Sequence, residues 1–369
     1  MATQLRTMTA AILTRFGGLD AITTRHDFPI PEIKAGEVLV EVGACGINNT
    51  DINTRAGWYN KSVRVGTTRE GGEHGFLLDP RYEVASIDQR FQFPRIQGAD
   101  VAGRIVEIGA GVDSNQLGQR VLIDPRIRDQ AEPDNLDLTS YLGNGVDGGF
   151  ANYCKVPAIN ALPIKSNCSN AELATFPCSS STAELMLERS GVTESDTILI
   201  TGASGGVGSA LIQLARRRGA RVIALTDRSK YTQVETLHPD HIVCRNSDTF
   251  ESEIRDNAPN GELDVIADVV GGQYFTKWLE LLKRGGRYVV SGAIGGPITE
   301  LDLRTLYLKD LDMLGATAIP RSIFSNLVGY IENQEIRPLL ACTFPLTELQ
   351  LAQQMFLQKE HFGNIVIVP

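Results

Sequence analysis

The strongest chemical signal in the chain is the segment 198–210, which reads Ile-Leu-Ile-Thr-Gly-Ala-Ser-Gly-Gly-Val-Gly-Ser-Ala. An apolar β-branched run meets a glycine-rich turn, and the turn leads directly into the helix-forming residues 210–215. We expect Gly205 and Gly206 to adopt backbone angles that side chains forbid and to let a pyrophosphate approach the main chain. Gly208 would let the helix pack closely on the strand. The first amides of a helix lack internal partners and favour negative charge, so this strand, turn and helix predict dinucleotide binding.

The residues after the next apolar run bear on which dinucleotide is bound. NAD-specific folds place an acid about 20 residues past the glycines, where it binds the ribose 2′-hydroxyl. Thr226 occupies that place here and is followed by Asp227, Arg228, Ser229 and Lys230. The hydroxyl and the two cations could bind a 2′-phosphate, whereas Asp227 could bind a 2′-hydroxyl and repel the phosphate. A solvated turn is the third interpretation, and we expect NADP(H) in preference to NAD(H).

The bulk properties exclude several classes of protein. A length of 369 residues suits two domains, and a formal net charge of −9 argues against nucleic-acid binding. Six cysteines are scattered without a C-x-x-C pair, which predicts reduced thiols in a cytoplasmic enzyme. No stretch reaches the roughly 18 apolar residues of a membrane helix, so we expect no membrane association. Residues 1–19 are basic enough for a transit peptide, but residues 9–13 before Gly17-Gly18 better fit a strand entering a hairpin.

The hydrophobic period changes along the chain. The first 160 residues favour strands, at 36–42, 103–108 and 119–123. After helices at 171–176 and 180–190, the alternation of strands and helices predicts a doubly wound parallel sheet with a cofactor crevice at the carboxyl ends of its strands. The expected strands are 197–200, 221–225, 241–243, 263–268 and 286–291, and the expected helices are 231–237, 249–256 and 274–282.

Two further segments need a place in this arrangement. A helix at 349–358 and a closing strand at 364–368 are expected to return to the β-rich first domain. The segment Asn60–Phe93 is long, polar and rich in Gly and Arg. A long loop in a compact domain is usually functional or disordered. Two interpretations of this segment therefore stay open: a lid over the site and a surface insertion.

Several blocks in order along the chain resemble one family. They are Gly43–Tyr59, Gly98–Gly103, Gly148–Tyr153 with Val156-Pro157, the glycine turn, and the closing Gly363–Pro369. This order is similar to that of the medium-chain dehydrogenase/reductase superfamily, and in particular of its zinc-independent quinone-oxidoreductase-like branch. The resemblance implies an α/β fold with a GroES-like β-rich catalytic domain from residues 1–160 and 319–369, and a Rossmann domain from residues 161–318.

The departures from the family pattern concern the metal. Zinc-dependent members carry Cys, His and a third Cys or Asp at positions that match Asn48, Ala99 and Cys178. A catalytic zinc needs about three nitrogen, sulfur or carboxylate ligands, which an amide and a methyl group cannot replace. The four-cysteine structural lobe is also missing, because residues 124–148 contain no Cys. We expect no zinc, since a site would need ligands from His74 or Asp100.

The resemblance also implies which side chains contact the cofactor and the substrate. Asn48 and Tyr59 would donate hydrogen bonds to a developing oxyanion, and Asp51 matches a proton-relay position. The alternatives are a turn residue for Asn48, a packed aromatic for Tyr59 and a structural hydrogen bond for Asp51. The cofactor residues implied by the turn and the family match are Thr182, Ala203, Ser204, Gly205, Gly206, Val207, Gly208, Asp227, Arg228, Lys230, Val270, Gly271, Ser291, Gly292, Ala293 and Asn364.

A metal-free site with a nicotinamide cofactor favours acceptors that spread charge by conjugation, because an unactivated alcohol normally needs a metal to lower its pKa. We therefore expect an NADP(H)-dependent reductase of a small-molecule quinone, enone or similar activated carbonyl compound. The alternatives are a zinc-free dehydrogenase or double-bond reductase of a specialised metabolite, and a nucleotide-sensing or structural protein with little turnover. The family also implies a homodimer, formed through the edge strand at 311–316.

Overall fold

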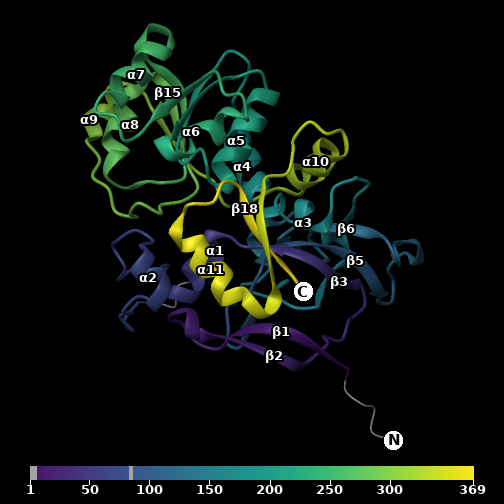
Figure 1. The fold of residues 1–369 in the computed structure, drawn as a ribbon. Helices are drawn as coiled ribbons and strands as arrows, with labels where there is room; N and C mark the ends of the chain where they lie inside the picture. The colour runs from purple at the N-terminus through teal and green to yellow at the C-terminus, as the bar shows by residue number, and fades with distance from the viewer. Residues whose placement is uncertain (1–5, 83–85) are drawn as a thin grey trace, which may run out of the picture. The chain divides into compact units, whose positions relative to one another are not determined.

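The computed structural model describes residues 6–82 and 86–369, and its contacts divide the chain into two compact units (Figure 1). The first unit comprises residues 1–63, 68–178 and 320–369, and the second comprises residues 64–67 and 179–319. The sequence places the first boundary at 160, whereas the contacts keep residues 161–178 with the first unit. The reason is strand β10 (Ala161–Pro163), which pairs antiparallel with β6 of the first unit.

The first unit is mainly β, as expected for a GroES-like domain. Its strands are β1 (Thr7–Leu13), β2 (Ile22–Pro29), β3 (Glu37–Gly46), β4 (Arg95–Ile96), β5 (Asp100–Ile108), β6 (Arg120–Ile123), β7 (Arg126–Ile127), β8 (Ser140–Tyr141), β9 (Tyr153–Pro157), β10, β17 (Leu340–Pro345) and β18 (Asn364–Val368). The largest sheet has the order β10-β6-β5-β3-β18-β17, and β9 also pairs with β3. The closing strand β18 therefore lies beside β3 from the start of the chain, as Figure 1 shows.

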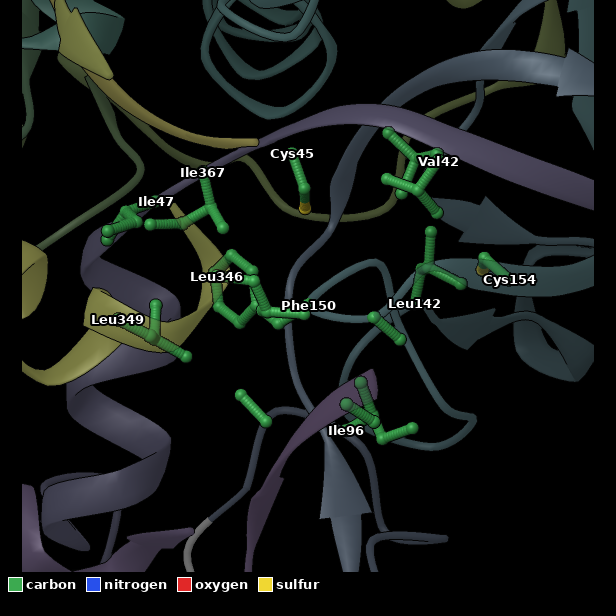
Figure 2. Packing of buried hydrophobic residues seen from close by; sticks show 14 of the residues in the cluster. Val42, Cys45, Ile47, Ile96, Leu142, Phe150, Cys154, Leu346, Leu349 and Ile367 are labelled. Carbon is green, nitrogen blue, oxygen red and sulfur yellow. The ribbon is translucent and has the colours of Figure 1, made fainter. Parts of the chain in front are cut away.

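The core of the first unit draws on both ends of the chain. Phe150 is fully buried in a cluster that includes Cys45 from β3, Ile367 from β18 and Leu346 after β17. Figure 2 shows Phe150 beside Leu346, with Leu142 and Ile96 in the same cluster. Burying side chains of this size stabilises the fold by about 1.5–3 kcal/mol each.

Three helices of the first unit meet at a buried arginine. The helices of this unit are α1 (Asn49–Ala56), α2 (Arg69–His74), α3 (Asn170–Leu173), α10 (Arg321–Glu332) and α11 (Leu349–Gln358). Arg55 of α1 donates to the Gln353 side chain on α11 and to the carbonyls of Gly17 and Gly72. Gly72 lies in α2, within the polar segment Asn60–Phe93. That segment is therefore anchored to the first unit through α2; residues 83–85 lie outside the described part.

The second unit confirms the expected doubly wound parallel sheet. Its strands are β11 (Thr197–Ile200), β12 (Arg221–Thr226), β13 (His241–Cys244), β14 (Leu263–Asp268), β15 (Leu282–Val290) and β16 (Asp312–Gly315), in the spatial order β13-β12-β11-β14-β15-β16. Its helices are α5 (Gly206–Arg217), α6 (Tyr231–Glu235), α7 (Phe250–Asn257), α8 (Phe275–Leu281) and α9 (Leu303–Leu308). All the strand pairs are parallel, and this strand order is that of a dinucleotide-binding Rossmann sheet.

Helix α4 (Pro177–Arg189) joins the two units in sequence and begins earlier than the expected residue 180. Proline is well suited to the first turn of a helix, because its missing N–H is not needed there. Helix α3 is correspondingly shorter than expected and begins after Ser169, whose hydroxyl accepts from the Glu172 amide. Among the described residues, no helix has both the length and the apolar character needed to cross a membrane.

Candidate functional site

The glycine-rich turn lies between β11 and α5 in the second unit. Its left-handed residue is Gly202, with φ 58°, whereas Gly205 is extended with φ −81° and ψ 171°. Gly206 is already the first residue of α5. The prediction that Gly205 and Gly206 need angles closed to other residues is therefore wrong. The chain reverses at Gly202, so Gly205 only has to cap the helix.

The close approach expected at Gly208 is confirmed. A Cβ on Gly208 would lie 2.2 Å from the carbonyl oxygen of Gly202, so no side chain fits between helix and turn. Gly205 is exposed. A Cβ added to it would lie 3.5 Å from its nearest neighbour, the carbonyl oxygen of Gly202. The free space beside Gly205 and the first amides of α5 fit a bound pyrophosphate. The predicted residues Ala203 and Ser204 lie on the same turn, and Val207 lies in the first turn of α5.

A buried carboxylate fixes the carboxyl edge of the parallel sheet beside the glycine-rich turn. Asp268 ends β14, and its Oδ1 accepts from the Thr201 hydroxyl at 2.6 Å and from the amides of Val270 and Gly271 at 2.8 and 3.1 Å. Its Oδ2 accepts from the Tyr288 hydroxyl of β15 at 2.7 Å. The ends of β11, β14 and β15 are thus tied to one side chain. This explains how the predicted residues Val270 and Gly271 are held at the carboxyl edge of the sheet.

The remaining predicted cofactor residues belong to several elements. Ser291 follows β15 and donates through its hydroxyl to the Ala316 carbonyl at 2.6 Å; Gly292 and Ala293 come next in the chain. Thr182 lies on α4. Asn364 begins β18 and belongs to the first unit, whereas all the others are in the second.

The residues after β12 form a polar cluster around Asp227. Its Oδ1 accepts from the Ser229 amide at 3.0 Å and the Ser229 hydroxyl at 2.9 Å. Its Oδ2 accepts from Asn246 at 2.7 Å and Arg245 at 3.3 Å. These hydrogen bonds hold the pKa of Asp227 below its usual range, and those from Ser229 have the largest effect. Sequence reasoning missed Arg245 and Asn246, which follow the neighbouring strand β13.

The predicted substrate side of the site is in the first unit, where Asn48 precedes α1. The Asn48 Nδ2 donates to Asp100 Oδ2 at 2.9 Å, and Asp100 Oδ1 accepts from the Cys178 amide at 2.7 Å. Asp100 is fully buried, so this one carboxylate joins the starts of α1 and α4. Burial raises the pKa of Asp100 to about 7.

The Asp51 side chain is occupied by the backbone. Its Oδ2 accepts from the Asn48 amide at 2.8 Å, and its Oδ1 accepts from the Gly98 amide at 3.2 Å. Burial raises the pKa of Asp51 to about 7, despite these hydrogen bonds. Of the two roles expected for Asp51, the geometry matches the structural hydrogen bond, because it fastens α1 to the strand-connecting segment at Gly98.

Tyr59 follows α1 and is half-buried. Its hydroxyl is hydrogen-bonded to Thr50 and Asn53, and its ring meets Trp58 edge-on with centroids 5.4 Å apart. Burial raises the pKa of Tyr59 to about 12, so the hydroxyl keeps its proton at neutral pH. A protonated phenol can donate a hydrogen bond, and the role of Tyr59 as a donor to the substrate stays a prediction.

Sequence reasoning missed one aromatic residue beside this cluster. The Tyr141 hydroxyl donates to the Cys178 Sγ at 3.2 Å. Nothing local in the sequence indicates this contact, because Tyr141 lies in a short strand between polar turns. Among residues 6–82 and 86–369, no group of three His, Cys, Asp or Glu side chains is placed to hold a metal ion.

The fold, the glycine-rich turn of the second unit and the polar residues around Asp100 in the first unit together define a dinucleotide-binding oxidoreductase. The family model of the alcohol dehydrogenase GroES-like domain matches residues 34–166, and that of the zinc-binding dehydrogenase matches residues 206–333. The chain belongs to the medium-chain dehydrogenase/reductase superfamily, and its fold supports binding of a nicotinamide cofactor.

Similar proteins match over most of the chain. A solved structure from Sinorhizobium meliloti 1021, assigned as an alcohol dehydrogenase, is 41% identical with a TM-score of 0.88, covering 100% of this chain and 98% of that one. The NAD-dependent alcohol dehydrogenase of Sulfolobus acidocaldarius is 27% identical over 92% of this chain and 94% of its own. The acryloyl-coenzyme A reductase of Metallosphaera sedula is 28% identical over 75% of this chain and 84% of its own.

The contrast between Gly208 and Gly205 gives a test of the turn. We expect Gly208→Ala to destabilise the protein by about 1–3 kcal/mol, because the new methyl group overpacks against Gly202. Gly205→Ala is the matched control and should leave thermal unfolding nearly unchanged, since its backbone angles suit alanine and its surroundings are open. Unfolding followed by circular dichroism checks both variants. Equal melting temperatures for wild type and Gly208→Ala would contradict the packing described here.

Proposed function

We propose that the protein is a zinc-independent, NADP(H)-dependent oxidoreductase that reduces quinones, enones or similar activated carbonyl compounds. The observation that carries this proposal is the bridge from the Asn48 amide through Asp100 to the amide of Cys178. The bridge orients the Asn48 amide, whose NH₂ group has a second N–H besides the one that Asp100 accepts, at a position where zinc-dependent relatives have a ligand.

The side chains do not fit the zinc that one matching family description names. Asn48 offers an amide, Ala99 a methyl group and Cys178 one thiol, whose sulfur already accepts from Tyr141. Asp100 could supply a carboxylate, but both of its oxygens accept hydrogen bonds. A tetrahedral site with three protein ligands cannot be built from this set without breaking the bridge.

The bound nicotinamide would supply the hydride, and the residues of the chain would bind and stabilise the acceptor. Addition of hydride to a conjugated acceptor moves an electron pair onto its oxygen. The N–H of Asn48 and the O–H of Tyr59 are suitable donors to that oxygen. The proton that completes the reduction would come from solvent or from Tyr59 with Thr50 as its partner. The acryloyl-coenzyme A reductase among the relatives supports reduction of an activated double bond.

Turnover and metal content together test this function. We expect the purified protein to oxidise NADPH in the presence of a small panel of quinones and enones, with no loss of rate after chelator treatment. Loss of NADPH absorbance measures the rate, and elemental analysis of the same sample measures zinc. Stoichiometric zinc, or a rate abolished by chelator, would contradict the metal-free site. NADPH binding without turnover of any acceptor would favour the sensing alternative, and oxidation of alcohols alone would favour a dehydrogenase.

The hydrogen bonds that Asp227 already accepts support the preference for NADP(H). A carboxylate has about four acceptor positions, and Asp227 already accepts four hydrogen bonds from Ser229, Asn246 and Arg245. It therefore has little capacity left for a ribose 2′-hydroxyl. Arg245, Arg228 and Lys230 make the surroundings net positive, which suits a 2′-phosphate. The relative from Sulfolobus acidocaldarius is NAD-dependent, so similar proteins also use NAD in place of NADP.

Cofactor affinities test this preference directly. We expect wild type to bind NADPH more tightly than NADH, and Arg245→Ala to weaken NADPH binding about ten- to hundredfold, because a hydrogen bond to a charged group contributes about 1.5–3 kcal/mol. Binding of NADH to the same variant is the control and should change little. Nucleotide fluorescence titration measures both dissociation constants. Tighter binding of NADH than NADPH by wild type would contradict the assignment.

The outer edge of the sheet supports the proposed homodimer. Strand β16 is the last strand in the order of the six-stranded sheet, and the neighbouring surface exposes Met313 on β16 with Leu303, Tyr307 and Leu308 on α9. A free strand edge beside exposed apolar side chains suits pairing about a two-fold axis.

Solution mass tests the dimer. We expect light scattering to give twice the 40.2 kDa of one chain for wild type. The double variant Tyr307→Asp with Met313→Asp should give a single chain, because burying two carboxylates in the interface is costly. Leu117→Asp, at an exposed residue elsewhere, is the control. A wild-type mass of one chain would refute the dimer.

A further inference from the structure

Tyr141 places a phenol beside the side chain of Cys178. It is buried in the two-stranded ladder of β7 and β8, and its hydroxyl donates to the Cys178 Sγ at 3.2 Å. A thiol sulfur is a weak acceptor, so this hydroxyl would gain by donating to an oxygen that carries negative charge.

The contacts around Cys178 show what Tyr141 can reach. The Cys178 amide is held by Asp100, and Asp100 in turn holds the Asn48 side chain. Tyr59 lies near enough to Cys178 for the thiol to affect its pKa. The Tyr141 hydroxyl thus contacts the side chain of Cys178, whose backbone amide shares the Asp100 carboxylate with the Asn48 side chain.

The protonation state of Tyr141 suits a donor. Burial raises its pKa well above the ordinary value, and the nearby Cys178 adds to this shift. The Arg126 guanidinium lies 5.2 Å from the centre of the Tyr141 ring and lowers that pKa by a smaller amount. Because burial dominates, the phenol keeps its proton and remains able to donate a hydrogen bond.

The polar segment Asn60–Phe93 holds Tyr141 in place. Asp88, which is buried, accepts from the Tyr141 amide at 3.0 Å and from the Ser140 hydroxyl. Asp88 also accepts from the Arg90 amide at 2.9 Å within its own turn. A single carboxylate of this segment therefore fixes both residues of β8.

A second link ties the same loop to α1. Asn144 Oδ1 accepts from the Thr54 hydroxyl of α1 and from the Ser86 hydroxyl, both at 2.9 Å. Between these polar anchors, Leu142 is fully buried in the core of the first unit, as Figure 2 shows. The loop that carries Tyr141 is thus fastened at Ser140, Leu142 and Asn144.

We propose that Tyr141 is a further catalytic residue, which donates a hydrogen bond to the substrate oxygen, and that Asp88 is the residue that positions it. This inference rests on the function proposed above. When hydride adds to the acceptor carbon, the π electron pair moves to the oxygen, and the Tyr141 O–H turns from the Cys178 Sγ to that oxygen. Tyr141 keeps its proton throughout, and solvent supplies the proton that completes the reduction.

Removal of one hydroxyl tests the catalytic role. We expect Tyr141→Phe to lower kcat for quinone or enone reduction about 10²-fold, the usual effect of losing one oxyanion donor, with the dissociation constant for NADPH unchanged. Tyr153→Phe, in β9 of the same unit, is the matched control and should keep the wild-type kcat. A wild-type kcat in Tyr141→Phe would overturn the assignment.

A double-mutant cycle tests the positioning role. We expect Asp88→Asn to lower kcat in the wild-type background and to have no further effect in the Tyr141→Phe background, because Asp88 acts through Tyr141. An equal loss in both backgrounds would show a merely structural role and overturn this part of the proposal.

A binding measurement separates the inference from the proposed reaction. The aromatic oxyanion 4-nitrophenolate carries a delocalised negative charge, and its absorbance reports binding without turnover. We expect wild type to bind it at least tenfold more tightly than Tyr141→Phe, even if no tested acceptor is reduced. Equal affinities, or no binding to wild type, would overturn the role of Tyr141; absence of turnover with the expected affinity difference would overturn only the proposed reaction.

Discussion

The site in the first unit depends on the hydrogen bonds that the buried carboxylate of Asp100 accepts. It has no cationic partner among the described residues, so its charge is balanced by the donors that it receives from Asn48 and from the Cys178 amide. A buried acid stabilised in this way is costly to disturb, because each lost donor leaves part of the carboxylate unsatisfied. The starts of α1 and α4 are consequently fixed to β5. The orientation of the Asn48 amide follows, since Asp100 Oδ2 accepts here and must face the amide nitrogen.

The second unit uses the same physical device at its carboxyl edge. Asp268 is also fully buried and also receives hydrogen bonds on both oxygens, from the ends of three neighbouring strands. The neighbouring Tyr288 has its pKa raised by burial and by this carboxylate, so its hydroxyl stays protonated as a donor. In both units, then, a buried acid organises backbone and side chains at a site and is not itself exposed to a ligand. Preorganised donors of this kind need no rearrangement when charge develops, which is why they are effective in catalysis.

Local patterns in the sequence predicted most of the fold, and they could not predict the long-range contacts. The β-branched run 197–200 and the helix 349–358 have the predicted bounds, because period and composition are local properties. The glycine turn was located correctly, yet the left-handed residue is Gly202 and not Gly205, since the direction of chain reversal depends on how α5 packs. Asp100 meets Asn48 across 52 residues and Tyr141 meets Cys178 across 37. No periodicity encodes such pairs.

The polar segment Asn60–Phe93 gains a physical role from this arrangement. Hydrogen bonds stabilise a developing oxyanion only if their donors are held in place before the charge appears, because reorienting them during the reaction has a free-energy cost. A metal ion imposes that order through its own coordination, whereas separate side chains need support from the protein. Asp88 and Ser86 supply such support to the loop of Tyr141, and Arg55 fastens α2 to α1 and α11. Through these contacts the described part of the segment is fastened to the first unit at α2, Asp88 and Ser86.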